Sequence, residues 1–133
     1  MSRKIYPFEP TWLDREYRKN FAQLAPTEQE QTKQDLASLI SALGECHHPT
    51  MDPLLGRWKP SSYGGLGVPG LYEYRLGPLS RVIVRCTDVA QSGDILLVAA
   101  TLVHDHERIK RLIAVHKQGL SRAPGSTGRR ADG

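Results

Sequence analysis

The sequence predicts a single α+β domain, in which an N-terminal helical hairpin packs on a small antiparallel β-sheet and a C-terminal helix follows. Three features of the chain predict this fold. Apolar residues recur at helical spacing between residues 11 and 43, strand-forming residues alternate between 71 and 102, and a basic helical pattern begins at 107. At 133 residues the chain has the usual length of one domain, which we expect to span residues 1–118.

The composition is that of a globular protein, with 39% hydrophobic and 24% charged residues. No apolar run approaches the roughly 18 to 20 residues that span a bilayer, and the first residues lack the apolar stretch of a signal peptide. We therefore expect a cytoplasmic protein. Cys46 and Cys86 are too few to form a metal site, so both are expected to be reduced thiols without a function.

Positive charge is concentrated in the second part of the chain. The formal net charge is +4, but residues 1–45 carry six Lys and Arg against seven Asp and Glu, whereas residues 46–133 carry twelve against seven. The basic part also holds the predicted sheet. Because Lys and Arg gain affinity by releasing the counterions of phosphate, this distribution favours a polyanionic partner. The alternative is a merely solvated basic surface.

The first predicted elements are an edge strand and a helix. Residues 5–8 are rich in strand formers, but they include Pro7, which a sheet tolerates only at an edge or near a strand end. From Thr11 the apolar period changes to about four residues, with charged residues between, which indicates an amphipathic helix. Its apolar positions are Leu13, Tyr17, Phe21 and Leu24.

A second helix is predicted after a tight turn. Ala25 and Pro26 end the first helix, and Thr27 with Glu30 three residues later has the spacing of a capping box. The second helix is therefore predicted to begin at Thr27. We expect it to end at Gly44, where a left-handed residue is easily accommodated. Its apolar face consists of Leu36, Leu39, Ile40 and Leu43.

The segment 45–70 is rich in Pro and Gly and has no period, so we expect a long loop. Long ordered loops in small domains often carry function. Here Arg57, Trp58, Lys59 and Tyr63 interleave basic and aromatic side chains, which could hold phosphate and stack a base. We favour the simpler interpretation that Trp58 anchors the loop on the core.

An antiparallel hairpin and a central strand are predicted next. Residues 71–76 alternate, residues 77–79 turn the chain, and residues 80–86 return with β-branched side chains. Residues 95–102 are apolar throughout, as in a central strand that is buried on both faces.

The chain is predicted to end in a helix and a tail. The segment that begins at Glu107 places Ile109, Leu112 and Ile113 on one face of an amphipathic helix. Residues 119–133 are rich in Gly, Ser and Arg and lack apolar anchors, so we expect them to form a disordered tail.

Arginines gather on one face of the predicted hairpin. Alternate residues of a strand share a face, so Arg81 and Arg85 point the same way, and Arg75 on the partner strand joins Arg81 if the register permits. Arginine forks bind phosphate bidentately and stay charged, which suits both binding and transition-state stabilisation. In the alternative interpretation, Glu73 pairs with one arginine and the others lie on a solvated sheet face.

Histidines follow the predicted central strand, at a strand end where side chains reach a cleft. Neutral His104 could accept a 2′-hydroxyl proton or donate one to a leaving oxygen. Alternatively, Asp105 or His106 is the N-cap of the last helix. His-x-His without a third ligand is weak support for a metal site, and nothing fixes its distance from His47 and His48.

The order of elements and two sequence segments together resemble the RelE/ParE toxin superfamily of bacterial toxin–antitoxin modules. Residues 69–76, Pro-Gly-Leu-Tyr-Glu-Tyr-Arg-Leu, and residues 80–85, Ser-Arg-Val-Ile-Val-Arg, resemble the family's Leu-Tyr, basic strand residue, short turn and Arg followed by apolar strand residues. Residues 95–111 resemble its last strand and the basic segment after it. The resemblance covers residues 4–113.

For RelE-like members the resemblance implies a RelE-like fold and a ribosome-dependent mRNA endonuclease that a cognate antitoxin protein neutralises. Arg81 matches the strand arginine that holds the scissile phosphate, Arg75 matches a basic residue of the preceding strand, and His104 falls where some members carry a general acid or base. No metal or other cofactor is implied, because the 2′-oxygen attacks the adjacent phosphate internally. Glu73 stands where the best-known member has lysine, which departs from a lysine-based mechanism.

Our first hypothesis is therefore an mRNA-cleaving toxin in which Arg75, Arg81 and His104 are catalytic. The residues expected to bind RNA or ribosomal RNA are Arg57, Lys59, Arg85, His106 and Arg108. The expected partners are mRNA on the ribosome and an antitoxin, with no membrane and no small-molecule substrate. Two alternatives stay open: a ParE-like inhibitor of DNA gyrase without chemistry, and a non-catalytic RNA-binding relative.

Overall fold

The computed structural model of the chain describes residues 3–7, 15–64, 67–86, 93–102 and 106–122. They form an α+β fold with a five-stranded mixed sheet. The strands are β1 (Ile5–Pro7), β2 (Ser61–Ser62), β3 (Leu71–Arg75), β4 (Arg81–Cys86) and β5 (Ile95–Thr101). The helices are α1 (Arg15–Ala22), α2 (Pro26–Glu45), the short 3-10 helix η1 (Pro53–Trp58) and α3 (His106–Arg122).

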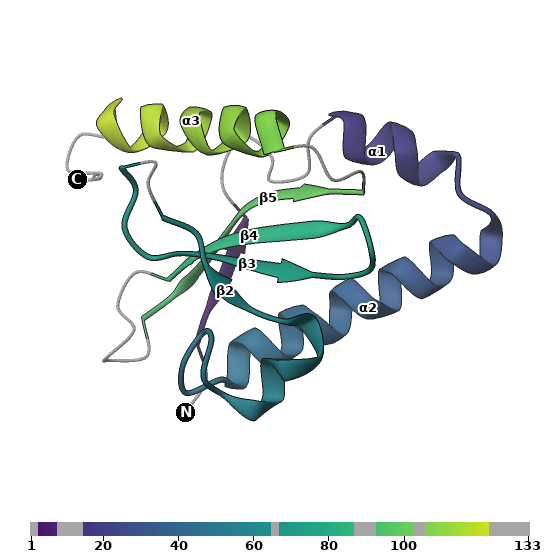
Figure 1. Cartoon of the computed structure of the whole chain (residues 1–133), viewed down its shortest axis with the longest axis horizontal. Coiled ribbons are helices and arrows are strands. Elements are labelled where there is room, and N and C mark those ends of the chain that lie inside the picture. Colours follow the sequence, from purple (N-terminus) through teal and green to yellow (C-terminus); the bar gives the residue numbers. More distant parts are fainter. Residues whose placement is uncertain (1–2, 8–14, 65–66, 87–92, 103–105, 123–133) are drawn as a thin grey trace.

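The sheet has the strand order β1-β5-β4-β3-β2 (Figure 1). Strands β3, β4 and β5 are antiparallel neighbours, as the sequence predicts, and β5 is an interior strand. The prediction of a purely antiparallel sheet is wrong, because β1 pairs with β5 in parallel. Two helices separate β1 from the other strands along the chain, so no tight hairpin constrains its direction. The predicted edge position of β1 is confirmed.

The sheet is buried on both faces, which gives the fold three layers (Figure 1). On one face, α1, α2 and η1 pack against a large core that includes Tyr74, Val82 and Leu97. On the other face, α3 packs against a smaller core that includes Ile83 and Ala99. Tyr74 and Ile83 therefore belong to opposite sides of one sheet, as strand alternation requires.

Helix α2 begins earlier and ends later than the sequence predicts. Its first residue is Pro26, whose fixed φ and missing N–H suit the first turn of a helix, so the predicted capping box at Thr27 is wrong. The N–H of Ala25 instead donates to a Glu28 side-chain oxygen at 3.1 Å. Gly44 is not the left-handed end but lies within the helix, which Cys46 terminates in an extended conformation.

Helices α1 and α2 meet at their connecting turn and diverge from it (Figure 1). The Gln29 side-chain amide donates to the Phe21 carbonyl at 3.0 Å and fastens the turn. Tyr17 of α1 and Leu39 of α2 are both buried in the large core, which confirms this part of the apolar faces predicted for the two helices. Thr11 and Leu13, where the first helix was predicted to begin, lie outside the described residues.

The predicted loop 45–70 is partly ordered into η1 and β2. Trp58 is only 4% exposed within the large core, which confirms that it anchors this segment. The N–H groups of His47 and Leu54 donate to the Asp52 carboxylate at 2.7 and 2.9 Å, and these bonds lower its pKa. Lys59 then ends η1 with a left-handed φ of 47°.

Arg3 ties the beginning of the chain to the end of α2. Its side chain is buried and donates to the carbonyls of Cys46, His47 and Gly93 at 3.0, 3.0 and 2.9 Å. It also donates to the Cys86 sulfur at 3.3 Å. Both cysteines are buried free thiols, as the sequence predicts, and burial raises the pKa of Cys46.

Helix α3 begins at His106 and continues to Arg122. It therefore extends into residues 119–122, which the sequence assigns to a disordered tail, while residues 123–133 lie outside the described structure. His104 and Asp105 also lie outside it. Across the described part of the chain, no helix combines the length and the apolar character needed to cross a membrane.

Candidate nucleic-acid interface

The two arginines predicted to cluster on the hairpin lie directly opposite each other. Arg75 on β3 and Arg81 on β4 are register partners, so their side chains leave the same face of the sheet. Their surroundings differ, because Arg75 is exposed whereas Arg81 is only 6% exposed. The register that the sequence leaves open therefore brings this pair together.

Arg81 is engaged by the turn between β3 and β4. Its Nη1 lies within hydrogen-bond distance of the carbonyl oxygens of Gly77, Pro78 and Ser80, at 3.2, 3.2 and 3.0 Å. The Ser80 hydroxyl donates to the Thr101 carbonyl at 2.8 Å and ties the same turn to β5. Bonds from a charged donor to several carbonyls hold a turn strongly, so this guanidinium stabilises the turn beside Arg75.

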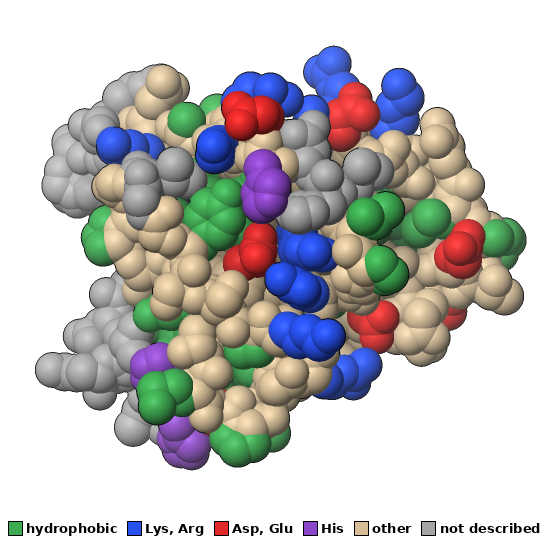
Figure 2. Space-filling model, viewed as in Figure 1, with side chains coloured by type: hydrophobic (Ala, Val, Ile, Leu, Met, Phe, Trp, Pro, Cys, Tyr) green, Lys and Arg blue, Asp and Glu red, His purple; other side chains and the backbone are tan. Residues whose placement is uncertain are grey.

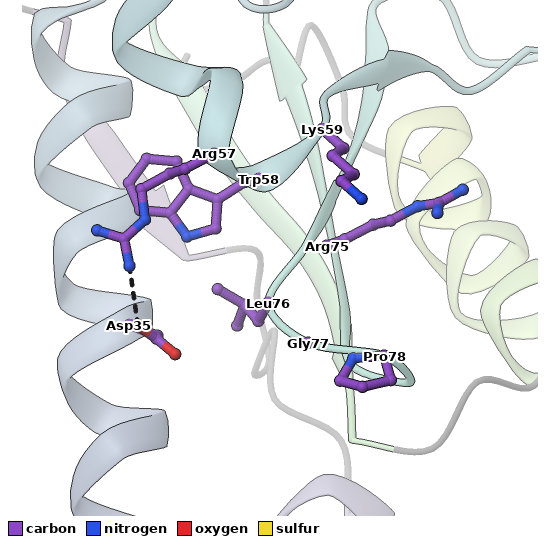
Figure 3. A pocket seen from close by; sticks show the side chains of 8 residues that line it. All are labelled: Asp35, Arg57, Trp58, Lys59, Arg75, Leu76, Gly77 and Pro78. Carbon is purple, nitrogen blue, oxygen red and sulfur yellow. Dashed lines mark hydrogen bonds and ion pairs between the residues drawn. The ribbon is translucent and has the colours of Figure 1, made fainter.

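A cavity of about 350 Å³ opens beside this turn. Figure 3 shows its lining, which comes from α2, from η1 and its end, and from the end of β3 with the following turn. β2 pairs only with Tyr72 and Glu73, so the last residues of β3 form an open sheet edge there. The lining residues are Asp35, Arg57, Trp58, Lys59, Arg75, Leu76, Gly77 and Pro78.

Arg57 is held at one side of this cavity. Its guanidinium carbon lies 4.7 Å from the centre of the Trp58 ring, which is a cation–π contact. Its Nη2 is 3.3 Å from Oδ1 of Asp35. The side chain is nevertheless 62% exposed. Because the indole is buried beneath it, Arg57 is the group that solvent and ligands meet at this side.

Lys59 lies on the other side of the cavity, and Arg75 lines its edge at the end of β3, with its guanidinium directed away from the cavity toward α3 (Figure 3). Both side chains are exposed, and neither has an ion pair with any residue that the structure describes. Figure 2 shows Lys and Arg side chains in a column across the middle of this face, between β3 and η1. An anion at this edge of the cavity would therefore meet Lys59, with the positive charge of Arg75 next to it on the α3 side of β3.

The other predicted RNA-binding residues lie outside this cavity. The Nε–H of Arg85 donates to the Pro69 carbonyl at 3.2 Å. Burial and, to a smaller extent, the positive charge of Arg85 lower the pKa of His116 to about 4. His106 and Arg108 lie in the first turn of α3, where His106 is exposed. The predicted catalytic His104 falls in the part of the chain that the structure does not describe.

Glu73 does not pair with an arginine in the described residues, in contrast to the alternative considered from the sequence. Its register partners are Ile83 on β4 and Ser61 on β2, and its Oε2 is buried without a hydrogen-bond partner there. Burial raises the pKa of the Tyr63 hydroxyl, and the negative charge of Glu73 raises it by a smaller amount. Glu73 therefore forms no ion pair with Arg75 among the described residues.

Asp35 is the charged residue of the cavity that the sequence did not indicate. It lies on α2 beside Leu36 of the apolar face, and its side chain is 21% exposed. The Gln31 amide donates to its Oδ1 at 3.3 Å, one helical turn away. In the sequence, the feature that marks Asp35 is this pair of an amide and a carboxylate four residues apart. Such pairs are common on solvated helix faces, so the pair does not by itself indicate a site.

Within the described residues, no group of three or more His, Cys, Asp and Glu side chains could hold a metal ion. No family model matches the chain, and neither the curated proteins nor the solved structures compared with it include a match.

Proposed function

We propose that the chain is the toxin of a type II toxin–antitoxin module, a RelE-like endonuclease that cleaves mRNA on the ribosome. The observation that supports this proposal most is two neighbouring exposed cations without an ion pair among the described residues, Lys59 at an open cavity and Arg75 at its edge. Cations of this kind gain affinity for a nucleic-acid backbone by releasing its counterions. A cavity that also holds Arg57 over an aromatic ring suits a single strand, whose bases are accessible.

The proposed reaction is internal transesterification. The 2′-oxygen attacks the adjacent phosphorus and loses its proton, while the 5′-oxygen of the next nucleotide leaves and receives a proton. Arg75 and Lys59 are proposed to stabilise the negative charge that develops on the phosphate oxygens. Arg81 is proposed to position Arg75 through the turn, and His104 remains the proposed proton-transfer residue.

The arrangement of elements also supports the proposal. Two helices precede the antiparallel strands β3, β4 and β5, and α3 follows them, which is the order that the resemblance to the RelE/ParE superfamily implies. A RelE-like arrangement of these elements and a cognate antitoxin are part of the proposal.

The test is induced expression of the full chain in bacteria, with mRNA 5′ ends mapped in cells whose ribosomes translate and in cells whose initiation is blocked. We expect growth arrest and new ends within translated codons only. The double variant Lys59→Ala/Arg75→Ala should reduce cleavage at least about tenfold, given two phosphate contacts. Lys19→Ala, which removes an exposed cation from α1, is the matched control.

Two results would reject the proposal. One is normal growth with intact mRNA when the soluble protein accumulates without a partner. The other is DNA-damage signalling with intact mRNA, which would indicate the gyrase-inhibiting alternative instead.

A further inference from the structure

We propose that the cavity between α2, η1 and the β3–β4 turn binds one nucleotide of single-stranded RNA and selects guanine, with Arg57 as the stacking surface and Asp35 as the reader of the base. This inference rests on the proposed function for the nature of the ligand. The inference adds a preference for one base, which the proposed binding of phosphate does not by itself predict.

The cavity has two chemically different sides. Figure 3 shows Asp35 and Arg57 on one side and Lys59 on the other, with Leu76 between them, while the Arg75 side chain leaves the edge of the cavity toward α3. A nucleotide has the same polarity, with a planar base at one end and an anionic phosphate at the other. With Lys59 on the phosphate of this nucleotide, and Arg75 near the strand where it leaves the cavity, the base would point toward Asp35 and Arg57. The volume of about 350 Å³ is at the small end of the range of ligand pockets, as expected for a single nucleotide.

Arg57 provides a flat surface that is already in place. The cation–π contact with Trp58 at 4.7 Å and the contact with Asp35 at 3.3 Å hold its guanidinium from one face and one edge. The side chain is 62% exposed, so its outer face is accessible. Nucleobases stack on arginine planes in many single-stranded RNA complexes. Little side-chain entropy would be lost on binding, because Arg57 is held before the base arrives.

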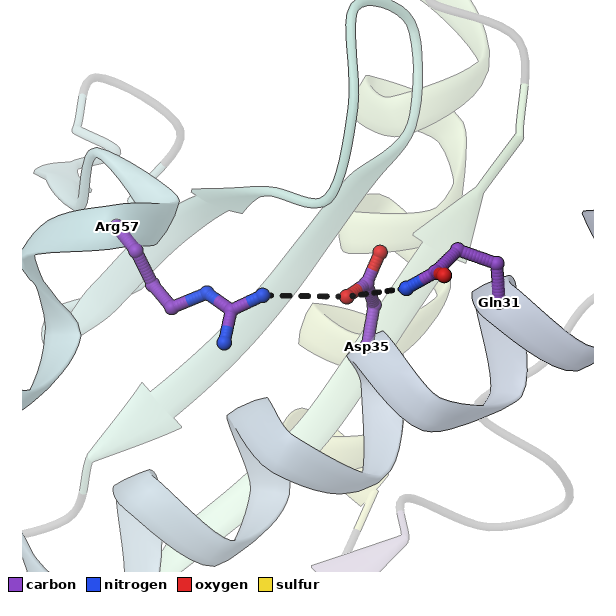
Figure 4. Close-up of polar contacts among 3 residues, drawn as sticks. All are labelled: Gln31, Asp35 and Arg57. Atoms are coloured by element: carbon purple, nitrogen blue, oxygen red, sulfur yellow. Dashed lines mark hydrogen bonds and ion pairs between the residues drawn. The ribbon is translucent and has the colours of Figure 1, made fainter.

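Asp35 provides a hydrogen-bond acceptor next to that surface. Figure 4 shows Arg57 and Gln31 both directed at Oδ1, with Oδ2 turned away from them. No residue in the described ranges donates a hydrogen bond to Oδ2. An ionised carboxylate accepts hydrogen bonds and donates none, so it binds a base edge that presents N–H groups.

Guanine is the base that fits this requirement best. Its Watson–Crick edge carries two adjacent donors, N1–H and the N2 amino group. Adenine and cytosine carry an amino group beside a ring-nitrogen acceptor, and uracil carries one N–H between two carbonyl acceptors. Each of these acceptors would be repelled by the Asp35 carboxylate. The arrangement therefore discriminates against three of the four bases by repulsion as well as by the loss of a bond.

The experiment measures binding of fluorescent RNA pentamers to the purified full chain. The pentamers are uridines with a central guanine, adenine, cytosine, uracil or hypoxanthine, the last of which lacks the N2 amino group. We expect the guanine pentamer to bind about tenfold more tightly than those with adenine, cytosine or uracil, in the range of a good base contact. The hypoxanthine pentamer should lie between them.

Variants then assign the roles. Asp35→Asn keeps the size of the side chain, removes its charge and adds a donor, so the guanine preference should fall to within about twofold while affinity for the uridine pentamer is kept. Arg57→Lys keeps the charge but loses the plane, so every pentamer should bind more weakly. Lys33→Ala removes an exposed charge elsewhere on α2 and should change neither quantity. Thermal unfolding of each variant identifies loss of folding.

Equal affinity of the wild-type chain for all pentamers would overturn the inference, as would a guanine preference that survives in folded Asp35→Asn. These measurements do not depend on cleavage. A chain that prefers guanine but leaves cellular mRNA intact would refute the endonuclease and keep the inference. A chain that cleaves mRNA but binds all pentamers equally would support the endonuclease and refute the inference.

Discussion

Arg75 and Arg81 face each other across β3 and β4, yet solvent reaches only Arg75. The difference follows from their positions in the sheet. β4 lies between two strands and leads from the turn whose carbonyls Arg81 binds, whereas Arg75 ends β3 where β2 no longer covers the edge. Two identical side chains in one register pair therefore have different surroundings: Arg75 is accessible to a ligand, whereas Arg81 is engaged by the turn.

Arg75→Ala should weaken RNA binding without changing stability. One phosphate contact would be lost, so the dependence of log affinity on log salt concentration should become shallower by about 0.7 for a single strand. Fluorescence anisotropy with a uridine oligonucleotide at several salt concentrations measures this slope. Lys19→Ala, an exposed cation on α1, should leave the slope as it is, and an unchanged slope for Arg75→Ala would contradict the assignment.

Arg81→Ala should lower the free energy of unfolding by about 2 kcal/mol, because the turn carbonyls lose a charged hydrogen-bond donor. Urea unfolding monitored by circular dichroism measures the change. Arg81→Lys keeps a charge but has no planar fork, so it should recover only part of the loss. If Arg81→Ala unfolds like the wild type but loses all RNA cleavage, the residue acts on substrate and not through the turn.

Stability should fall as the pH decreases from about 6.5 to about 4. Burial, with a smaller effect of the Arg85 charge, lowers the pKa of His116 from 6.5 to about 4 in the folded chain. In this window the unfolded chain binds a proton that the folded chain does not, so acid favours unfolding, by an amount on the order of 2 kcal/mol. Urea midpoints at successive pH values give the slope. His116→Leu should flatten it, whatever its effect on stability at neutral pH.

Gly70→Ala should destabilise the fold by about 2 kcal/mol. Gly70 has a φ of +78°, and an added Cβ would lie 2.6 Å from the Cys86 carbonyl oxygen, at a point where the Cys86 N–H donates to the Gly70 carbonyl. Gly56→Ala is the control, because no described atom lies within 4 Å of its added Cβ and its φ is not in the left-handed region. Thermal unfolding of the two variants should differ clearly, and equal midpoints would contradict the argument.

The antiparallel part of the fold could be predicted because its signal is local. Strand alternation and a short turn determine the β3–β4 hairpin, and the apolar run of β5 indicates an interior strand. The parallel pairing of β1 could not be predicted, since it depends on where two helices return the chain. The same holds for η1, which forms where Trp58 enters the core and not where a local period indicates a helix.

The sequence indicated several of the residues that line the cavity, but not how they lie relative to one another. Interleaved basic and aromatic residues indicated Arg57 and Lys59, and strand alternation indicated Arg75. Alternation gives the face of a side chain but not what it contacts, so the engagement of Arg81 by turn carbonyls could not be seen. Asp35 lies on a helix distant in sequence from the other cavity residues, and only tertiary packing brings it to Arg57.

Lys59 combines a left-handed backbone, which lowers the stability of the fold, with a positive charge at the cavity. A side chain in this conformation costs about 1 kcal/mol relative to glycine, which adopts it freely, and glycine is the residue that commonly ends helices in this way. Selection for thermal tolerance alone would therefore favour glycine at this position. A chain that retains lysine there keeps a positive charge at the cavity at a cost in stability. If the cavity binds RNA as proposed, the most heat-resistant variants of this protein should include ones that bind RNA more weakly.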